Sequence, residues 1–82
     1  MRTPDIEAQI RQQPFVPFLM HMSDGSHFEI RHPEMMLISE RVLGVAVYDR
    51  PGAQRATRIV MCDPIHVTRL EPINGQLTDK RR

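Results

Sequence analysis

The stretch from Val16 to Arg31, VPFLMHMSDGSHFEIR, decides the fold of this chain. Apolar and polar residues alternate on both sides of a central Asp24-Gly25 pair, a pattern typical of a β-hairpin. Two registers are open to this hairpin. A two-residue loop divides the large apolar side chains between both faces of the sheet. A type I turn with Gly25 as a left-handed bulge residue instead pairs Met22 with Ser26 and gathers those side chains on one face.

Burial favours the second register, because a slip of one residue moves every side chain to the opposite face. One face then carries only apolar side chains, which are Phe18, Met20, Met22, Phe28 and Ile30. The other face carries Leu19, His21, His27, Glu29 and Arg31. We therefore expect the first face to form the core and the second to meet solvent.

The residues around the hairpin predict one helix before it and further strands after it. Thr3 should cap the helix, and Pro14 should end it near residue 12. Four later strands are predicted at residues 34–39, 42–48, 57–62 and 67–71. We expect the first of these to be buried and the second, VLGVAVY, to be central because it is apolar on both faces. Asp63 should cap a single tight helical turn before the last strand.

Short strands separated by turn signals favour a small closed barrel. We therefore expect a mainly β fold, in which an N-terminal helix is followed by a five- to six-stranded SH3-like or Sm-like barrel. A split-sheet α+β domain is the alternative. The expected single domain spans residues 1–77, and residues 78–82 form a mobile basic tail.

Composition limits the class of protein. The 82 residues suffice for one small core, and the formal net charge of +1 neither favours nor excludes nucleic acid as a partner. The single cysteine, Cys62, excludes an internal disulfide and suits a reducing compartment. The sequence has no apolar run long enough to span a membrane. We expect a cytoplasmic protein without a membrane partner.

The hairpin resembles that of the Sm-like fold, in the branch of bacterial RNA chaperones whose chains also open with a helix. The similar residues are Phe18-x-Met20-x-Met22-x-Asp24-Gly25 and, more loosely, residues 34–38 and 65–72. Ile30 stands where that family carries a glycine, and the family's lysine-histidine pair before the last strand is not matched. The resemblance implies the barrel fold and, less directly, RNA binding.

Most of the chain is also similar to short bacterial proteins of unassigned function. The similar segments are a Pro-Phe-x-Pro-Phe run at residues 14–18, the Asp-Gly hairpin, an Arg-His-Pro-Glu step at 31–34 and a Val-Thr-Arg-Leu-Glu ending at 67–71. This resemblance implies the same fold, and it implies no activity, catalytic residue or cofactor.

One candidate metal site lies on the polar face of the hairpin. In the favoured register His21 lies opposite His27, and Glu29 is diagonal to His21. Two imidazoles and a carboxylate suit zinc or a similar ion. Ordinary cross-strand polar pairs on a solvated face are the alternative, and the one that we favour.

The sequence offers no catalytic site. Cys62 has no partner at the spacing of a recognisable nucleophile, and no glycine-rich phosphate loop is present. Carboxylate pairs suited to acid–base catalysis cannot be identified either. We therefore expect a protein that is not an enzyme and that needs no cofactor.

Cations gather at one loop and at the end of the chain. They are Arg50, Arg55 and Arg58, which flank one loop, and Lys80, Arg81 and Arg82 at the end. Forked and mobile cations contact phosphates, although a solvated loop and a solubilising tail are the simpler interpretation.

These observations predict a non-catalytic binding module for protein partners, including copies of itself. The apolar run 42–48 and an exposed Leu19 leave apolar surface that so short a chain cannot cover. The alternative is binding of RNA or single-stranded nucleic acid through the arginine loop and the basic tail.

Overall fold

The computed structural model describes residues 1–73, which form one helix and six strands. The helix α1 spans Thr3–Ile10. The strands are β1 (Phe18–Met22), β2 (His27–Ile30), β3 (Met36–Ile38), β4 (Leu43–Val47), β5 (Arg58–Cys62) and β6 (Val67–Pro72). Single turns of 3₁₀ helix, η1 (Pro33–Met35) and η2 (Pro64–His66), precede β3 and β6. The predicted tail at 78–82 lies outside the described residues.

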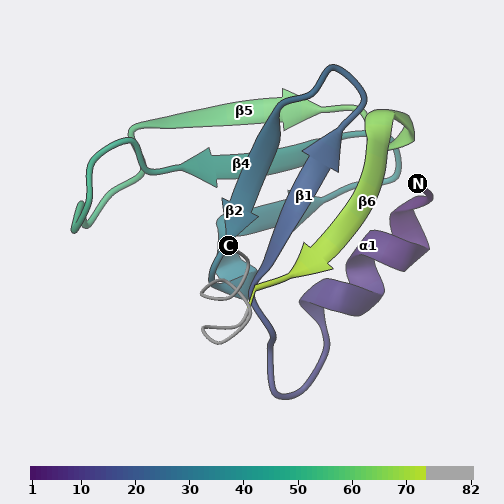
Figure 1. Ribbon diagram of the computed structural model, residues 1–82, viewed down its shortest axis with the longest axis horizontal. Coiled ribbons are helices and arrows are strands. Elements are labelled where there is room, and N and C mark those ends of the chain that lie inside the picture. The colour runs from purple at the N-terminus through teal and green to yellow at the C-terminus, as the bar shows by residue number, and fades with distance from the viewer. Residues whose placement is uncertain (74–82) are drawn as a thin grey trace, which may run out of the picture.

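The strands form two antiparallel three-stranded sheets, with the orders β2-β1-β6 and β3-β4-β5. Figure 1 shows the strands of the first sheet crossing those of the second, with α1 beside β6. Side chains from both sheets and from the helix fill one core. Its buried members are Ile6, Phe18, Met20, Ile30, Met36, Leu43, Val45 and Val67. The mainly β architecture with an N-terminal helix is therefore as predicted.

The predicted register of the hairpin is confirmed. Phe18 pairs with Ile30, and the Met22 N–H donates to the Ser26 carbonyl at 2.9 Å. Gly25 has a φ of +92°, in the left-handed region that the bulged turn requires. The face that was predicted to be apolar accordingly contributes three of its five side chains to the buried core, and the other two pack against that core.

Asp24 fixes the turn from its side chain. Its Oδ1 accepts hydrogen bonds from the Ser26 N–H at 2.9 Å and from the Ser26 hydroxyl at 2.7 Å. These bonds, the hydroxyl first, lower the pKa of Asp24 because the charged carboxylate is the better acceptor. These bonds therefore stabilise the folded protein at a pH above the pKa that Asp24 has in the unfolded chain. The stabilisation is lost as the pH falls through the lower pKa that Asp24 has in the folded protein.

The expected barrel is not closed, which corrects that part of the prediction. Within residues 1–73, no strand pair joins one sheet to the other. The chain passes between the sheets without strand pairing from β5 to β6 and from β2 to β3, where η1 begins after His32. Proline has no N–H and a fixed φ, so it breaks the strand that would otherwise run from one sheet into the next.

Two local predictions near the helix and β3 are wrong. Thr3 does not cap α1, because the N-cap position is held by Arg2 and the Thr3 hydroxyl donates to the Glu40 carbonyl at 3.2 Å. The strand predicted at 34–39 is shortened by η1, and it is not buried on both faces, since 76% of Leu37 is exposed.

Two other local predictions are confirmed. The strand β4 lies between β3 and β5, as its two apolar faces indicated. Asp63 caps η2, where its Oδ1 accepts a hydrogen bond from the Ile65 N–H at 3.0 Å.

Substitution of Gly25 tests the bulged turn. Gly25→Ala should lower the free energy of unfolding by about 1 to 2 kcal/mol, the cost of a left-handed backbone for an L-residue. An added Cβ meets no atom within 4 Å at Gly25, so the loss reports on the backbone alone. Gly44→Ala is the control, because its Cβ would make only an ordinary contact, 3.8 Å from the Leu37 Cβ. Urea unfolding measures both, and equal losses would contradict the assigned turn.

Candidate functional site

The outer face of the β3-β4-β5 sheet carries large apolar side chains in solvent. Side chains alternate between the two faces of a sheet, and directly paired residues share a face. Leu37 and Met61 both pair with Gly44, and Ile59 pairs with Ala46. The outer face is therefore formed by Leu37, Gly44, Ala46, Ile59 and Met61. The exposed fractions are 76% for Leu37, 71% for Ile59 and 75% for Met61. We refer to these five residues as the outer face.

The two small residues of the outer face lie on its central strand. Gly44 and Ala46 belong to β4, whereas the three large side chains belong to β3 and β5 on either side. None of the five residues is charged. Exposed apolar side chains gathered on one sheet face, rather than scattered singly, mark an interaction site.

The sequence indicated this surface only in part. Leu19, which was expected to be exposed, is half-buried on the other sheet. The run 58–62, RIVMC, was predicted as a strand, and its lack of alternation is the signal for a strand that is apolar on both faces. The sequence does not show that one of these faces is left open.

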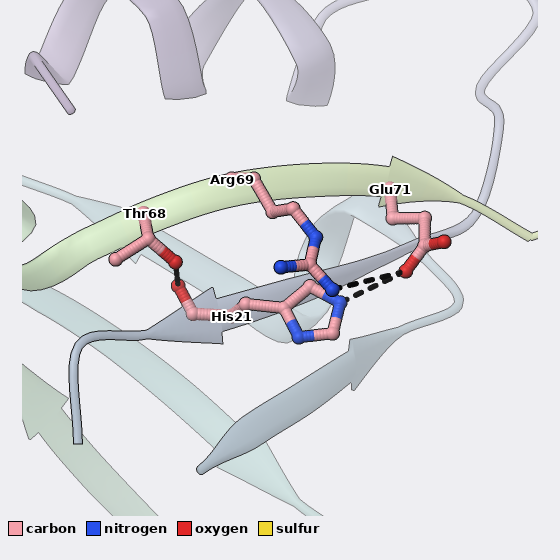
Figure 2. Close-up of polar contacts among 4 residues, drawn as sticks. All are labelled: His21, Thr68, Arg69 and Glu71. Carbon is pink, nitrogen blue, oxygen red and sulfur yellow. Dashed lines mark hydrogen bonds and ion pairs between the residues drawn. The ribbon is translucent and has the colours of Figure 1, made fainter. Parts of the chain in front are cut away.

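The polar face of the hairpin forms a network with β6 (Figure 2). His21 Nε2 lies 2.9 Å from Glu71 Oε1, and Arg69 Nη2 lies 3.9 Å from the same oxygen. The Thr68 hydroxyl donates to the His21 carbonyl at 3.2 Å. The ring of His27 lies beside that of His21, with a centroid separation of 5.9 Å.

The structure brings together two of the three predicted metal ligands. His21 and His27 are adjacent, but Glu29 is engaged in an ion pair with Arg31. Within the described part of the chain, no group of three or more His, Cys, Asp or Glu side chains is placed to hold a metal ion. The contacts present are exposed polar pairs of the ordinary kind, across strands for His21 with Glu71 and two residues apart for Glu29 with Arg31, and each contributes little to stability.

Only some of the arginines of the predicted nucleic-acid site lie at the same cleft. Arg50 and Arg58 line one cleft together with Arg31, and Arg55 is exposed in the same loop. Arg58 is not a free cation, because its Nε lies 3.2 Å from Asp49 Oδ2. The other three predicted cations, Lys80, Arg81 and Arg82, lie outside the described residues.

Cys62 lies half-buried at the end of β5 and packs against the core. Burial raises the pKa of its thiol, and the negative charge of Asp24 adds to this shift. A raised pKa leaves less of the nucleophilic thiolate at neutral pH, so the environment of Cys62 is that of an unreactive core cysteine.

Thiol reactivity tests this placement. At pH 8 the folded protein should react with a chromogenic disulfide reagent several-fold more slowly than the urea-unfolded chain, because both shielding and the raised pKa reduce the reactive thiolate. The rate for the folded protein should still be rising at a pH where the rate for the unfolded chain has levelled off. Equal rates and equal pH profiles in the two states would show that Cys62 is neither shielded nor shifted.

In the described part of the chain, no helix is both long and apolar enough to cross a membrane. Comparisons with protein-family models, with curated proteins and with solved structures found no match to this chain.

Proposed function

We propose that this protein is a non-catalytic binding module that docks other proteins on the outer face of the β3-β4-β5 sheet and that also associates with copies of itself. The observation that carries the proposal is the exposure of Leu37, Ile59 and Met61, between 71% and 76%, on one uncharged sheet face. These residue types are otherwise the ones that fold into a core.

The energy available on the outer face fits a binding role. Complete burial of one large aliphatic side chain stabilises a complex by about 1.5 to 3 kcal/mol. Three such side chains, together with the backbone around Gly44, therefore offset a good part of the cost of association. A solvated surface that had no partner would gain nothing from holding them in water.

The proposal includes an affiliation with the SH3-like or Sm-like small barrels, as an opened variant. The chain has the helix, the Asp24-Gly25 hairpin and the short helical turn before the last strand on which the resemblance rests. The strand order also supports it, because β6-β1-β2 continues through η1 into β3-β4-β5.

Substitution of Met61 tests the docking surface. Met61→Lys places a charge on the outer face and should reduce co-purification of specific protein partners from the source cells by about tenfold or more. Ile65→Lys is the matched control, because Ile65 is similarly exposed, at 69%, but lies on η2 away from the outer face. Urea unfolding verifies that both variants fold. Loss of the same partners in both variants, or in neither, would contradict the proposal.

A second candidate function is binding of RNA or single-stranded nucleic acid. It is favoured by the cleft on which Arg31, Arg50 and Arg58 converge. Two of these arginines are paired with Glu29 and Asp49, which reduces the positive charge that a phosphate would meet. We therefore place this function second.

Salt dependence separates the two functions. We expect a labelled single-stranded oligonucleotide mixture to show no salt-sensitive binding at about 10 μM protein, since two of the three arginines of the cleft are already paired with carboxylates. An affinity that falls several-fold between about 50 and 200 mM salt, and that Arg50→Ala abolishes, would favour the nucleic-acid function instead. Arg41→Ala, an exposed arginine outside the cleft, serves as the control.

A further inference from the structure

We propose that two copies of this chain pair antiparallel through the open edge of β5, about a two-fold axis at Val60, to form one six-stranded sheet. This inference specifies the self-association within the proposed function. It uses the edge of the sheet and leaves the outer face available for other partners.

The strand β5 is an open edge. It pairs with β4 on one side, and no strand of residues 1–73 pairs with its other side. Its five residues, RIVMC, contain a single charge, at Arg58. Natural edge strands are protected from pairing by charges, prolines, bulges or short length, and β5 has none of these at its centre.

The other sheet edges are less suited to self-pairing. The strand β3 has only three residues, and β2 has four, of which His27 and Glu29 are polar and exposed. The start of β6 is held by the amino group of Met1, which donates to the Val67 carbonyl at 2.8 Å. Self-pairing therefore favours β5.

The alternation of side chains selects the register of this pairing. In an antiparallel pair, residues that lie directly opposite one another point to the same side of the sheet. An axis at Val60 pairs all five residues of β5. It sets Ile59 of each copy opposite Met61 of the other, so that this apolar pair occurs twice. Moving the axis by one residue sets Arg58 opposite Val60, or Ile59 opposite Asp63, and replaces the two Ile59–Met61 pairs with a single pair of identical residues.

The inner side of β5 is hollowed next to the hairpin. A groove along this strand is lined by residues of the hairpin and of β5, among them Met22, Phe28, Val60 and Cys62. The inward side chain of an added strand at its centre is again Val60, which suits the apolar part of this groove. The docked strand would therefore cover apolar surface on both sides of the sheet.

Charge at the two ends of β5 is complementary for an antiparallel pair. The end next to the 48–57 loop carries Arg50, Arg55 and Arg58 against one acidic residue, Asp49. The other end carries Asp63, and Asp24 is close enough to act on the thiol of Cys62. Antiparallel pairing sets the basic end of each copy beside the acidic end of the other, whereas parallel pairing sets like charges together.

The paired sheet has a consequence for the proposed function. Two outer faces join across the axis into one continuous apolar surface, with Ile59 and Met61 of both copies at its centre. A partner protein then meets about twice the apolar area that one chain presents, which brings the surface closer to the size of a stable interface.

The first test is the oligomeric state of the full chain. Light scattering and sedimentation from about 5 to 500 μM should show a reversible monomer–dimer equilibrium. Arg58→Glu should weaken the dimer by about tenfold, because the axis doubles each lost contact, while Arg41→Glu should leave it unchanged. A protein that remains a monomer throughout this range overturns the proposal.

The second test locates the axis by disulfide formation. Ile59→Cys and Met61→Cys are each made in a Cys62→Ala background, one of them isotope-labelled, and are oxidised separately and as a mixture. The mixed 59–61 disulfide should form several-fold faster than either symmetric disulfide, since only opposite positions approach closely enough. A mixture of Met61→Cys with Ile65→Cys is the control. Equal rates for all pairs would overturn the proposed register.

The two proposals fail in different ways. A monomeric chain whose partners are still lost with Met61→Lys overturns the β5 pairing and leaves the docking face intact. A dimer with the 59–61 disulfide and unchanged partners in Met61→Lys overturns the docking face and leaves the β5 pairing intact.

Discussion

The positive φ of Gly25 is the constraint on which the rest of the structure depends. It allows a turn in which Met22 pairs with Ser26, and this pairing fixes which side chains of β1 and β2 face inward. Because β1 is the central strand of its sheet, its orientation also fixes the side of the sheet from which β6 buries Val67. A turn one residue shorter would move the side chains of β2 to the face opposite those of β1 with which they now pack.

The two sheets differ in the surface that each exposes to solvent. The first sheet has a polar outer surface, on which Glu71 of β6 contacts His21 of β1 and Arg69 of its own strand. The second has apolar side chains on both surfaces, of which only one is covered by the fold. Residues 1–73 have a single α-helix with which to cover two sheets, and this helix packs into the shared core through Ile6.

Local patterns in the sequence were enough to predict the hairpin, its core face, the central position of β4 and the cap at Asp63. Each of these depends on residues within a few positions of one another. The open barrel was not predictable, because a proline after a strand can bend the ladder of hydrogen bonds or break it, and tertiary packing decides which. The bond from Thr3 to Glu40 and the pairing of His21 with Glu71 join segments that are distant in sequence. The exposed outer face was hidden for a related reason, since a strand that is apolar on both faces has the same sequence whether its second layer comes from the same chain or from another.

The position of β1 between β2 and β6 has a consequence for folding during synthesis. One neighbour of β1 follows it after a four-residue turn, whereas the other lies far along the chain, as the 50 positions between His21 and Glu71 show. A growing chain can therefore close its hairpin early, but it must keep the second edge of β1 and the space for Val67 open until nearly all the described residues have left the ribosome. Such long-range pairing is slow, and the unfinished half-sheet is the species most exposed to association with neighbouring nascent chains.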